Sequence, residues 1–289
     1  MSARRVIGVA ASFVAMGIAS VGLTACQPPI PDRYVALGDS YTAGPLIPNQ
    51  STDPLGCLRS DHNYPSIVKT RIKVTKFRDN SCSGATTTDL YNVQNVTPGP
   101  NQPQLDLVDS ETKVVTMGMG GNDIGFTDIV KTCALQNPFG SGCKSSFVHG
   151  TDDTLIDRIN ATAPKIDFAL ASIRGKSKLA KIFVIGYPTI LPATGTGCYP
   201  KVPILPGDVV YLRGIEQALN AMLKARAIAA HDYFVDTATS SIGHDACASA
   251  NWVEGIIPTH VAAPVHPNAS GMMNTGLVVA AAINAVVKT

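Results

Sequence analysis

Residues 34–44 read Tyr-Val-Ala-Leu-Gly-Asp-Ser-Tyr-Thr-Ala-Gly, an apolar run followed by a glycine-rich turn. A short apolar run that stops at glycine is typical of a buried strand that leads into a tight turn. The same arrangement recurs at residues 113–123, where a β-branched, apolar run stops at Gly-Gly-Asn-Asp. The two stretches predict two buried strands, each with polar side chains directly after its carboxyl end.

Strand and helix patterns alternate along the rest of the chain. The predicted strands are short and apolar: 34–37, 74–77, 113–119, 181–187 and 233–236. The predicted helices have apolar residues at helical spacing: 64–72, 153–173, 208–231 and 267–287. In the last helix, Pro267 is expected at the first position. This alternation predicts an α/β fold, with one parallel sheet covered on both faces, in a single domain from residue 33 to 289.

The composition is that of an ordinary globular chain. It has 289 residues, of which 45% are hydrophobic and 15% charged, and it contains 25 Gly and 20 Pro. These values exclude collagen, coiled coils and intrinsic disorder. Without Arg4 and Arg5, which lie in the leader, basic and acidic residues are equal in number at 21. A neutral body without a run of Lys or Arg lacks a basic surface, so we expect no nucleic acid partner.

Residues 1–25 have the pattern of an export signal peptide. Arg4 and Arg5 form a basic start, and Val6–Leu23 is an unbroken run of apolar and small residues. The run is long enough to be considered as a membrane-spanning helix. It is, however, diluted by glycine and serine, and no basic cluster follows it.

The end of this run, Leu23-Thr-Ala-Cys26, resembles the lipobox of bacterial lipoproteins. This resemblance implies that Cys26 is diacylated and becomes the first residue of the mature chain. Residues 26–32 would then be a short tether between the membrane and the domain. Plain secretion, with Cys26 unmodified, and a retained membrane helix are the alternatives.

Six cysteines remain besides Cys26, and an even number in an exported chain predicts disulfides. They can pair in 15 ways, and nearest neighbours form the shortest loops: Cys57–Cys82, Cys133–Cys143 and Cys198–Cys247. Only the middle pair is nearly forced by proximity. Because the close Cys-x-x-Cys spacing of zinc sites is absent from the sequence, we expect no metal, and no feature indicates a cofactor.

Four residues that could form a functional site follow strands or precede a helix. Ser40, Gly84 and Asn122 lie after the first three predicted strands, and His266 precedes the last helix. In an open α/β sheet, ligands bind beyond the carboxyl ends of the strands. We therefore expect these residues to meet in one site.

The four segments around these residues resemble, in order, the four blocks of the GDSL or SGNH hydrolases. They are Gly38-Asp-Ser40, Ser83-Gly-Ala85, Gly120-Gly-Asn-Asp123 and His266-Pro-Asn268. The six cysteines are similar to the arrangement in secreted actinobacterial esterases and lipases of that family. The resemblance implies a flavodoxin-like three-layer α/β/α sandwich and serine-dependent hydrolysis of acyl esters. It also implies a substrate that is an acyl ester or lipid.

The residue types fit this chemistry without reference to the family. Ser40 can act as a nucleophile from a glycine-flanked turn, and His266 can take its proton as a general base. Three N–H donors can surround the developing oxyanion: the Ser40 backbone, the Gly84 backbone and the Asn122 amide. We expect Asp39 to order the turn, and we expect the protein to be a monomer.

The family's usual orienting acid lies three residues before the histidine, and here that position is Ala263. Some relatives use a backbone carbonyl instead, which implies that the carbonyl of Ala263 or of Pro264 accepts from His266 Nδ1 and fixes its tautomer. Glu254 and Asp245 are the alternatives for a displaced acid. Two other functions also stay open: acyl transfer or deacylation on envelope glycans or glycolipids, and a non-catalytic envelope-binding lipoprotein.

Overall fold

The structure, a computed structural model, describes residue 1 and residues 32–134 and 139–287. Cys26 and the predicted signal peptide after Met1 lie outside the described residues. So does the predicted tether, except for Asp32.

A parallel five-stranded sheet forms the centre of the fold, with the order β2-β1-β3-β6-β7. Its strands are β1 (Arg33–Gly38), β2 (Lys76–Asp79), β3 (Thr112–Gly118), β6 (Lys181–Ile185) and β7 (Tyr233–Val235). The central strands β1, β3 and β6 are buried on both faces, which explains their continuous apolar sequences. A small antiparallel pair, β4 (Val148–His149) and β5 (Asp152–Asp153), stands apart from this sheet.

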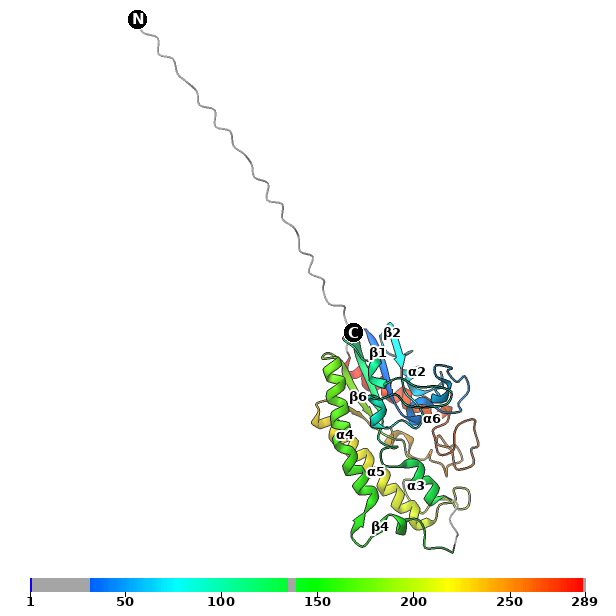
Figure 1. The fold of residues 1–289 in the computed structure, drawn as a ribbon. Coiled ribbons are helices and arrows are strands. Elements are labelled where there is room, and N and C mark those ends of the chain that lie inside the picture. Colours follow the sequence, from blue (N-terminus) through cyan, green and yellow to red (C-terminus); the bar gives the residue numbers. More distant parts are fainter. Residues whose placement is uncertain (2–31, 135–138, 288–289) are drawn as a thin grey trace.

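Helices cover both faces of the sheet, as Figure 1 shows. Helices α4 and α5 pack together over one face, and α2 and α6 pack together over the other. The helices are α1 (Ser40–Ala43), α2 (Tyr64–Val68), α3 (Phe126–Cys133), α4 (Thr154–Lys176), α5 (Pro206–Ala229) and α6 (Ala269–Val286). Short 3₁₀ turns occupy Leu55–Cys57, Thr87–Leu90, Gln104–Leu107, Lys144–Ser146 and Thr239–Ser241. These three layers confirm the predicted α/β/α architecture.

The start of α6 differs from the prediction. Pro267 precedes the helix, and Asn268 is its N-cap, accepting hydrogen bonds from the backbone N–H groups of Ser270 and Gly271. An asparagine cap satisfies two of the N–H groups that a helix leaves free, which a proline at the first position cannot do. Helix α6 is apolar and long enough to cross a membrane, but its residues from Gly271 to Ile283 pack one side against the sheet.

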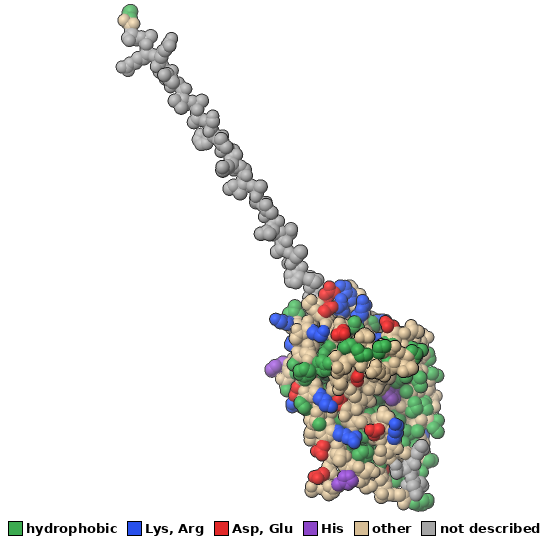
Figure 2. Space-filling model, viewed as in Figure 1, with side chains coloured by type: hydrophobic (Ala, Val, Ile, Leu, Met, Phe, Trp, Pro, Cys, Tyr) green, Lys and Arg blue, Asp and Glu red, His purple; other side chains and the backbone are tan. Residues whose placement is uncertain are grey.

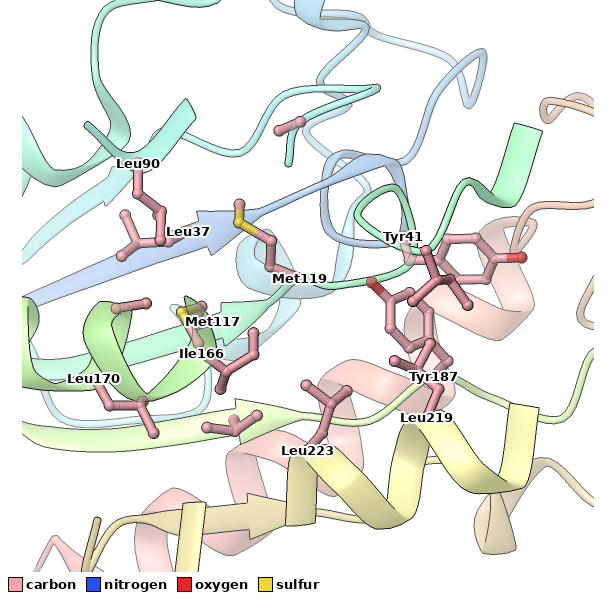
Figure 3. Close-up of a cluster of buried hydrophobic side chains, with 14 of the residues drawn as sticks. Leu37, Tyr41, Leu90, Met117, Met119, Ile166, Leu170, Tyr187, Leu219 and Leu223 are labelled. Atoms are coloured by element: carbon pink, nitrogen blue, oxygen red, sulfur yellow. The ribbon is translucent and has the colours of Figure 1, made fainter. Parts of the chain in front are cut away.

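The apolar core on the α4–α5 side continues to the carboxyl ends of the strands. Figure 3 shows Leu37 and Met117 between the sheet and its helices, with Tyr41 and Tyr187 at the end of the same cluster. The two tyrosine rings contact each other edge to face, with centroids 5.2 Å apart. The floor of the region beyond the strands is therefore rigid and aromatic.

Strand order places the predicted site. The chain runs from β1 outward to β2 and then returns to the other side of β1 as β3, so β1 and β3 flank the topological switch point. Gly38 and Gly118, the last residues of these two strands, are register partners. The turns that follow them, with Ser40 and Asn122, begin side by side in the crevice where α/β proteins bind ligands.

Three disulfides join the loops: Cys57–Cys82, Cys133–Cys143 and Cys198–Cys247. They are the nearest-neighbour pairs among the 15 possible pairings. On the face drawn in Figure 2, basic and acidic side chains are interspersed.

Candidate active site

Ser40 is the first residue of α1, directly after β1 and Asp39. The turn is possible because Gly38 lacks a side chain: a Cβ there would lie 2.1 Å from Thr42 Oγ1 and 2.7 Å from the Gly118 carbonyl oxygen. At the first position of a helix the backbone N–H has no acceptor within the helix. Ser40 thus presents both its hydroxyl and its N–H at the end of the strand.

Asp39 orders this turn, the role expected for it. Its side chain caps α1 by accepting from the Tyr41 backbone N–H at 2.8 Å, and it accepts from the Tyr187 hydroxyl at 2.5 Å. Burial raises the pKa of the Asp39 carboxyl to about 7, although both hydrogen bonds lower it. The carboxyl faces the aromatic floor and not His266.

His266 lies beside Ser40, although 226 residues separate them in the chain. Its Nε2 is 2.7 Å from Ser40 Oγ, and its Nδ1 is 2.7 Å from the carbonyl oxygen of Pro264. A carbonyl oxygen can only accept, so Nδ1 carries the proton and Nε2 is free to accept from the serine hydroxyl. This is the tautomer that a general base toward serine requires.

The structure distinguishes between the two carbonyls expected to orient the histidine. The Pro264 oxygen accepts from the ring, whereas the Ala263 oxygen accepts from the His266 backbone N–H at 3.2 Å. Because both ring nitrogens are already bonded, no carboxylate is needed to complete the pair. Burial lowers the pKa of His266, and the Pro264 carbonyl only partly counteracts it.

The two alternative acids have other partners. Glu254 is buried and accepts from the side chains of Asn251, Asn268 and Thr259, and it pairs with His260. Burial opposes ionisation of Glu254, but these hydrogen bonds outweigh it and lower its pKa to about 2. Asp245 accepts from the Cys247 backbone N–H. Glu254 therefore stabilises the loop before His266 and Asp245 stabilises its own turn, and neither carboxylate has a hydrogen bond to the His266 ring.

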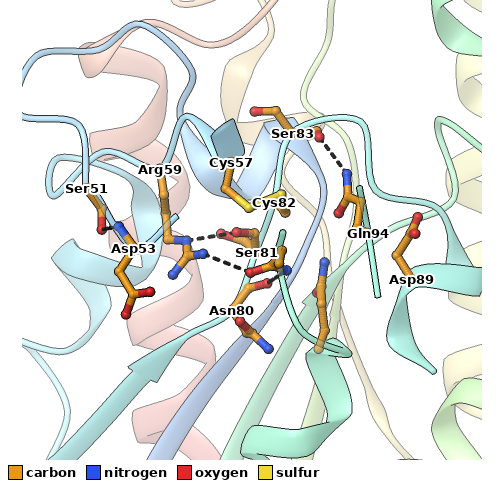
Figure 4. Close-up of a disulfide and its surroundings, with 12 residues drawn as sticks. Ser51, Asp53, Cys57, Arg59, Asn80, Ser81, Cys82, Ser83, Asp89 and Gln94 are labelled. Atoms are coloured by element: carbon orange, nitrogen blue, oxygen red, sulfur yellow. Dashed lines mark hydrogen bonds between the residues drawn. A yellow bond between two sulfur atoms is a disulfide. The ribbon is translucent and has the colours of Figure 1, made fainter. Parts of the chain in front are cut away.

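Gly84 lies in the loop that follows β2, with φ +79°, a conformation that favours glycine. Its neighbours Ser83 and Ala85 donate their N–H groups to carbonyls of Cys57 and Cys82. The N–H of Gly84 has no acceptor among the residues that the structure describes. Figure 4 shows what holds this loop: the Cys57–Cys82 disulfide and Gln94, whose amide donates to the Ser83 carbonyl at 2.9 Å.

Asn122 is fixed by the same loop. Its Nδ2 donates one hydrogen to the Ala85 carbonyl at 2.9 Å, which leaves the second hydrogen of the amide for a ligand. The next residue, Asp123, accepts from the backbone and hydroxyl of Thr87 at 2.9 and 2.6 Å. The turns after β3 and β2 are thus tied together, and the amide is oriented before any ligand arrives.

The four predicted residues line one cleft of about 320 Å³. Ser40, Gly84, Asn122 and His266 share it with residues from α3 and the 263–265 segment. Among the described residues that line it, Lys131 is the one Lys, Arg, Asp or Glu. Within the described part of the chain, no group of three or more His, Cys, Asp or Glu side chains could hold a metal ion.

A second, apolar cavity adjoins this cleft. It has a volume of about 90 Å³, and Phe126, Val130 and Val265 line both spaces. Its wall is otherwise formed mainly by apolar side chains of α3, α5 and the disulfide-bonded loops, and the carboxylates Glu216 and Glu254 also line it. Burial raises the pKa of Glu216 to about 8, so its carboxyl is mostly uncharged at neutral pH.

Sequence reasoning missed two residues of the site, Tyr41 and Tyr187. The hydroxyl of Tyr41 donates to the Val265 carbonyl at 2.6 Å, and the Tyr187 hydroxyl accepts from the Gly121 backbone N–H at 2.7 Å. Each tyrosine follows closely on a strand, at the edge where ligands bind, and this position is the one signal that could have singled them out.

Several known proteins are similar to this chain in sequence and in fold. The model of the GDSL-like lipase/acylhydrolase family matches residues 36–273. Lipase 2 of Streptomyces coelicolor is 37% identical to this chain over 278 residues, covering 90% of this chain and 91% of that protein.

Two solved structures resemble the whole domain. The extracellular lipase from Streptomyces rimosus matches with a TM-score of 0.74 and 28% identity, covering 89% of this chain and 100% of that one. Phospholipase A1 from Streptomyces albidoflavus NA297 matches with a TM-score of 0.69 and 26% identity, covering 87% of this chain and 98% of that one.

Proposed function

Because this chain belongs to the GDSL-like lipase/acylhydrolase family and is a carboxylic ester hydrolase, we propose that it cleaves acyl esters through a Ser40–His266 dyad. The 2.7 Å distance between His266 Nε2 and Ser40 Oγ is the observation that carries this proposal. It lies within the range needed for direct proton transfer between a nucleophile and its base.

The proposed reaction has two halves. His266 Nε2 takes the proton as Ser40 Oγ attacks the ester carbonyl, and the same nitrogen then returns that proton to the departing alkoxide. Water then gives a proton to the neutral histidine as it attacks the acyl-serine, and His266 returns this proton to Ser40 Oγ as the acyl–oxygen bond breaks and the carboxylic acid leaves. The Pro264 carbonyl keeps Nδ1 protonated throughout, so Nε2 is always the nitrogen that exchanges the proton.

We assign the oxyanion hole to the backbone N–H groups of Ser40 and Gly84 and to the Asn122 amide. The free N–H of Gly84 and the unused hydrogen of Asn122 support this assignment. All three groups are fixed by hydrogen bonds, helix geometry or the disulfide, so little reorganisation is required when negative charge develops on the carbonyl oxygen.

The apolar cavity is the proposed place for the acyl chain. It adjoins the cleft at Phe126, Val130 and Val265, and most of the side chains in its wall are apolar. Each methylene that leaves water for such a cavity contributes about 0.8 kcal/mol. Esters of apolar acyl chains are therefore the favoured substrate class.

We place this activity outside the cytoplasm. The three disulfides are typical of exported proteins, and a relative of similar fold is an extracellular lipase. Removal of residues 1–25 and lipid attachment at Cys26 are part of the proposal and rest on the sequence pattern alone. Mass spectrometry of the mature N-terminus from its native host would test them.

Hydrolysis of p-nitrophenyl acyl esters tests the proposed function. We expect the wild-type protein to release p-nitrophenol and Ser40→Ala to lose at least about a thousandfold in kcat, because the nucleophile is gone. Ser145→Ala is the matched control, since this exposed serine lies outside the cleft. An inactive wild-type protein, or a Ser40→Ala variant with full activity, would contradict the proposal.

A further inference from the structure

We propose that Tyr41 is a positioning residue that holds the His266 ring in its reactive tautomer, through a hydrogen bond to the backbone beside it. This inference rests on the proposed function, because it assigns His266 as the base. It concerns a residue whose side chain takes no part in the reaction itself.

The backbone that orients His266 is strained at Val265. This residue has φ +61°, a left-handed conformation that a β-branched residue rarely adopts. The strained turn lets the Pro264 carbonyl, two residues before the histidine, reach Nδ1 at 2.7 Å. Such a conformation persists only when its surroundings hold it.

Four hydrogen bonds hold the two peptide units on either side of Val265. In the first unit, the Val265 N–H donates to the Gly255 carbonyl at 3.1 Å, and the Pro264 carbonyl accepts from the ring. In the second unit, the His266 N–H donates to the Ala263 carbonyl, and the Val265 carbonyl accepts from the Tyr41 hydroxyl at 2.6 Å. Three of these bonds lie within the 255–266 loop.

Tyr41 is the member of this set that comes from outside the loop. It follows Ser40 in α1 and is itself fixed, since its backbone N–H donates to Asp39 and its ring packs against Tyr187. Its bond to Val265 spans 224 residues of sequence. The side chain therefore couples the turn of the predicted nucleophile to the loop of the predicted base.

The ring of Tyr41 also packs against the imidazole, with centroids 5.0 Å apart. Burial raises the pKa of Tyr41 well above its usual value, so its hydroxyl stays a donor across the working pH range. Phe126 also packs edge to face with His266, with centroids 6.0 Å apart, and Lys131 lines the same cleft. Asp39 bonds to Tyr187, and Glu254 bonds to His260. Neither carboxylate has a hydrogen bond to the His266 ring.

Tyr41 in this way supplies part of what a carboxylate would supply in an ordinary triad. A carboxylate attracts the ring through its charge. The neutral Pro264 carbonyl can orient the ring only while it lies within hydrogen-bond distance of Nδ1, so contacts must hold the carbonyl in place. Losing the Tyr41 hydroxyl frees the second peptide unit, so Val265 can relax and the Pro264 carbonyl can turn away from Nδ1.

Tyr41→Phe tests the inference, because it removes the hydroxyl and keeps the ring. We expect kcat on p-nitrophenyl esters to fall roughly tenfold with KM unchanged. The acidic limb of the kcat/KM profile should move to lower pH, because the Pro264 hydrogen bond, which raises the pKa of His266, is weakened. Nitrogen-15 NMR of His266 should change from the Nδ1-protonated tautomer to a mixture.

Tyr34→Phe is the matched control. Its buried hydroxyl bonds to Thr116 at 2.8 Å within the sheet, so the variant should lose thermal stability while keeping the pH profile and the tautomer. Unchanged kcat, pH profile and His266 tautomer in Tyr41→Phe would overturn the inference. An inactive wild-type protein would instead defeat the proposed function, and the NMR tautomer would still decide the role of Tyr41.

Discussion

At the scale of single residues, the histidine of this protein is oriented by a neutral carbonyl. The Pro264 oxygen fixes the tautomer of His266 but adds no negative charge, and burial lowers the pKa of the ring. The neutral, proton-accepting form therefore persists at lower pH than it would beside a carboxylate. In the proposed mechanism, stabilisation of the protonated intermediate is correspondingly weaker, so we expect more of the rate to come from the proposed oxyanion donors.

Asn122→Ala measures the contribution of one such donor. We expect kcat to fall about a hundred- to a thousandfold with little change in KM, because in the proposed mechanism the amide bonds the oxyanion and not the ground-state ester. Steady-state kinetics on a p-nitrophenyl ester provide the measurement. Asn92→Ala, which removes an exposed amide bonded to the Thr88 carbonyl, is the control and should leave kcat unchanged. An increase in KM with kcat unchanged would contradict this role.

Asp39 makes stability depend on pH. Burial raises the pKa of its carboxyl from 3.8 to about 7, so between these values the folded state keeps a proton that the unfolded chain releases. The folded state then binds more protons, and the contribution of Asp39 to the free energy of unfolding falls as pH rises. Asp39→Asn cannot ionise and lacks this dependence.

Urea denaturation at pH 5 and pH 8 checks this prediction. The free energy of unfolding of the wild type, relative to Asp39→Asn, should fall by about 3 kcal/mol over this range. Asp236→Asn is the control: burial acts to raise the pKa of Asp236, but hydrogen bonds from Thr239 and Ala238 together lower it. The difference in free energy of unfolding between the wild type and Asp236→Asn should therefore stay constant from pH 5 to pH 8. If the free energy of unfolding of the wild type, relative to Asp39→Asn, rose with pH, the raised pKa assigned to Asp39 would be refuted.

The residues of the site could be located from sequence, but their contacts could not. Ser40, Gly84, Asn122 and His266 stand out because each follows a strand or precedes a helix in a recognisable segment. The choice of Pro264 over Ala263 depends on the left-handed conformation of Val265, and a valine gives no signal for that conformation.

At the scale of secondary-structure elements, long periodic segments were predicted well and short ones were not. The helices α4 and α5 match expectation closely because their apolar spacing extends over many turns. The four-residue α1 has no such period, and it forms because Asp39 caps it after β1. Helix α3 was not among the predicted helices, although it supplies Phe126 and Val130 to the cleft.

Helix α5 offers a test of the acyl cavity. Ile215→Phe enlarges a buried side chain that lines the cavity, so it should block long acyl chains. We expect kcat/KM for p-nitrophenyl octanoate to fall at least about tenfold, the equivalent of two displaced methylenes, while the acetate ester changes little.

Ile228→Phe makes the same change at an exposed position of the same helix and serves as the control. The ratio of octanoate to acetate activity should stay at the wild-type value in this variant. An equal loss on both esters in Ile215→Phe would indicate general disruption of the site. A full octanoate rate would show that the acyl chain lies elsewhere.

At the scale of the whole molecule, the order of strands creates the site. The sequence predicts parallel strands and covering helices, but strand order depends on how distant segments pack, and no local pattern encodes it. In the structure, β1 and β3 are neighbours with their last glycines in register, so two turns more than 70 residues apart meet at the switch point. The last turn before α6 then delivers His266 from the far end of the chain.

Labelling with a fluorophosphonate is the most direct measurement of the central claim, because this probe bonds only to a serine activated by a base. After protease digestion, mass spectrometry should find the adduct on the peptide that contains Ser40, and His266→Ala should abolish it. An adduct on a different serine, or equal labelling of Ser40 when His266 is absent, would contradict the claim that these two residues form the reactive pair.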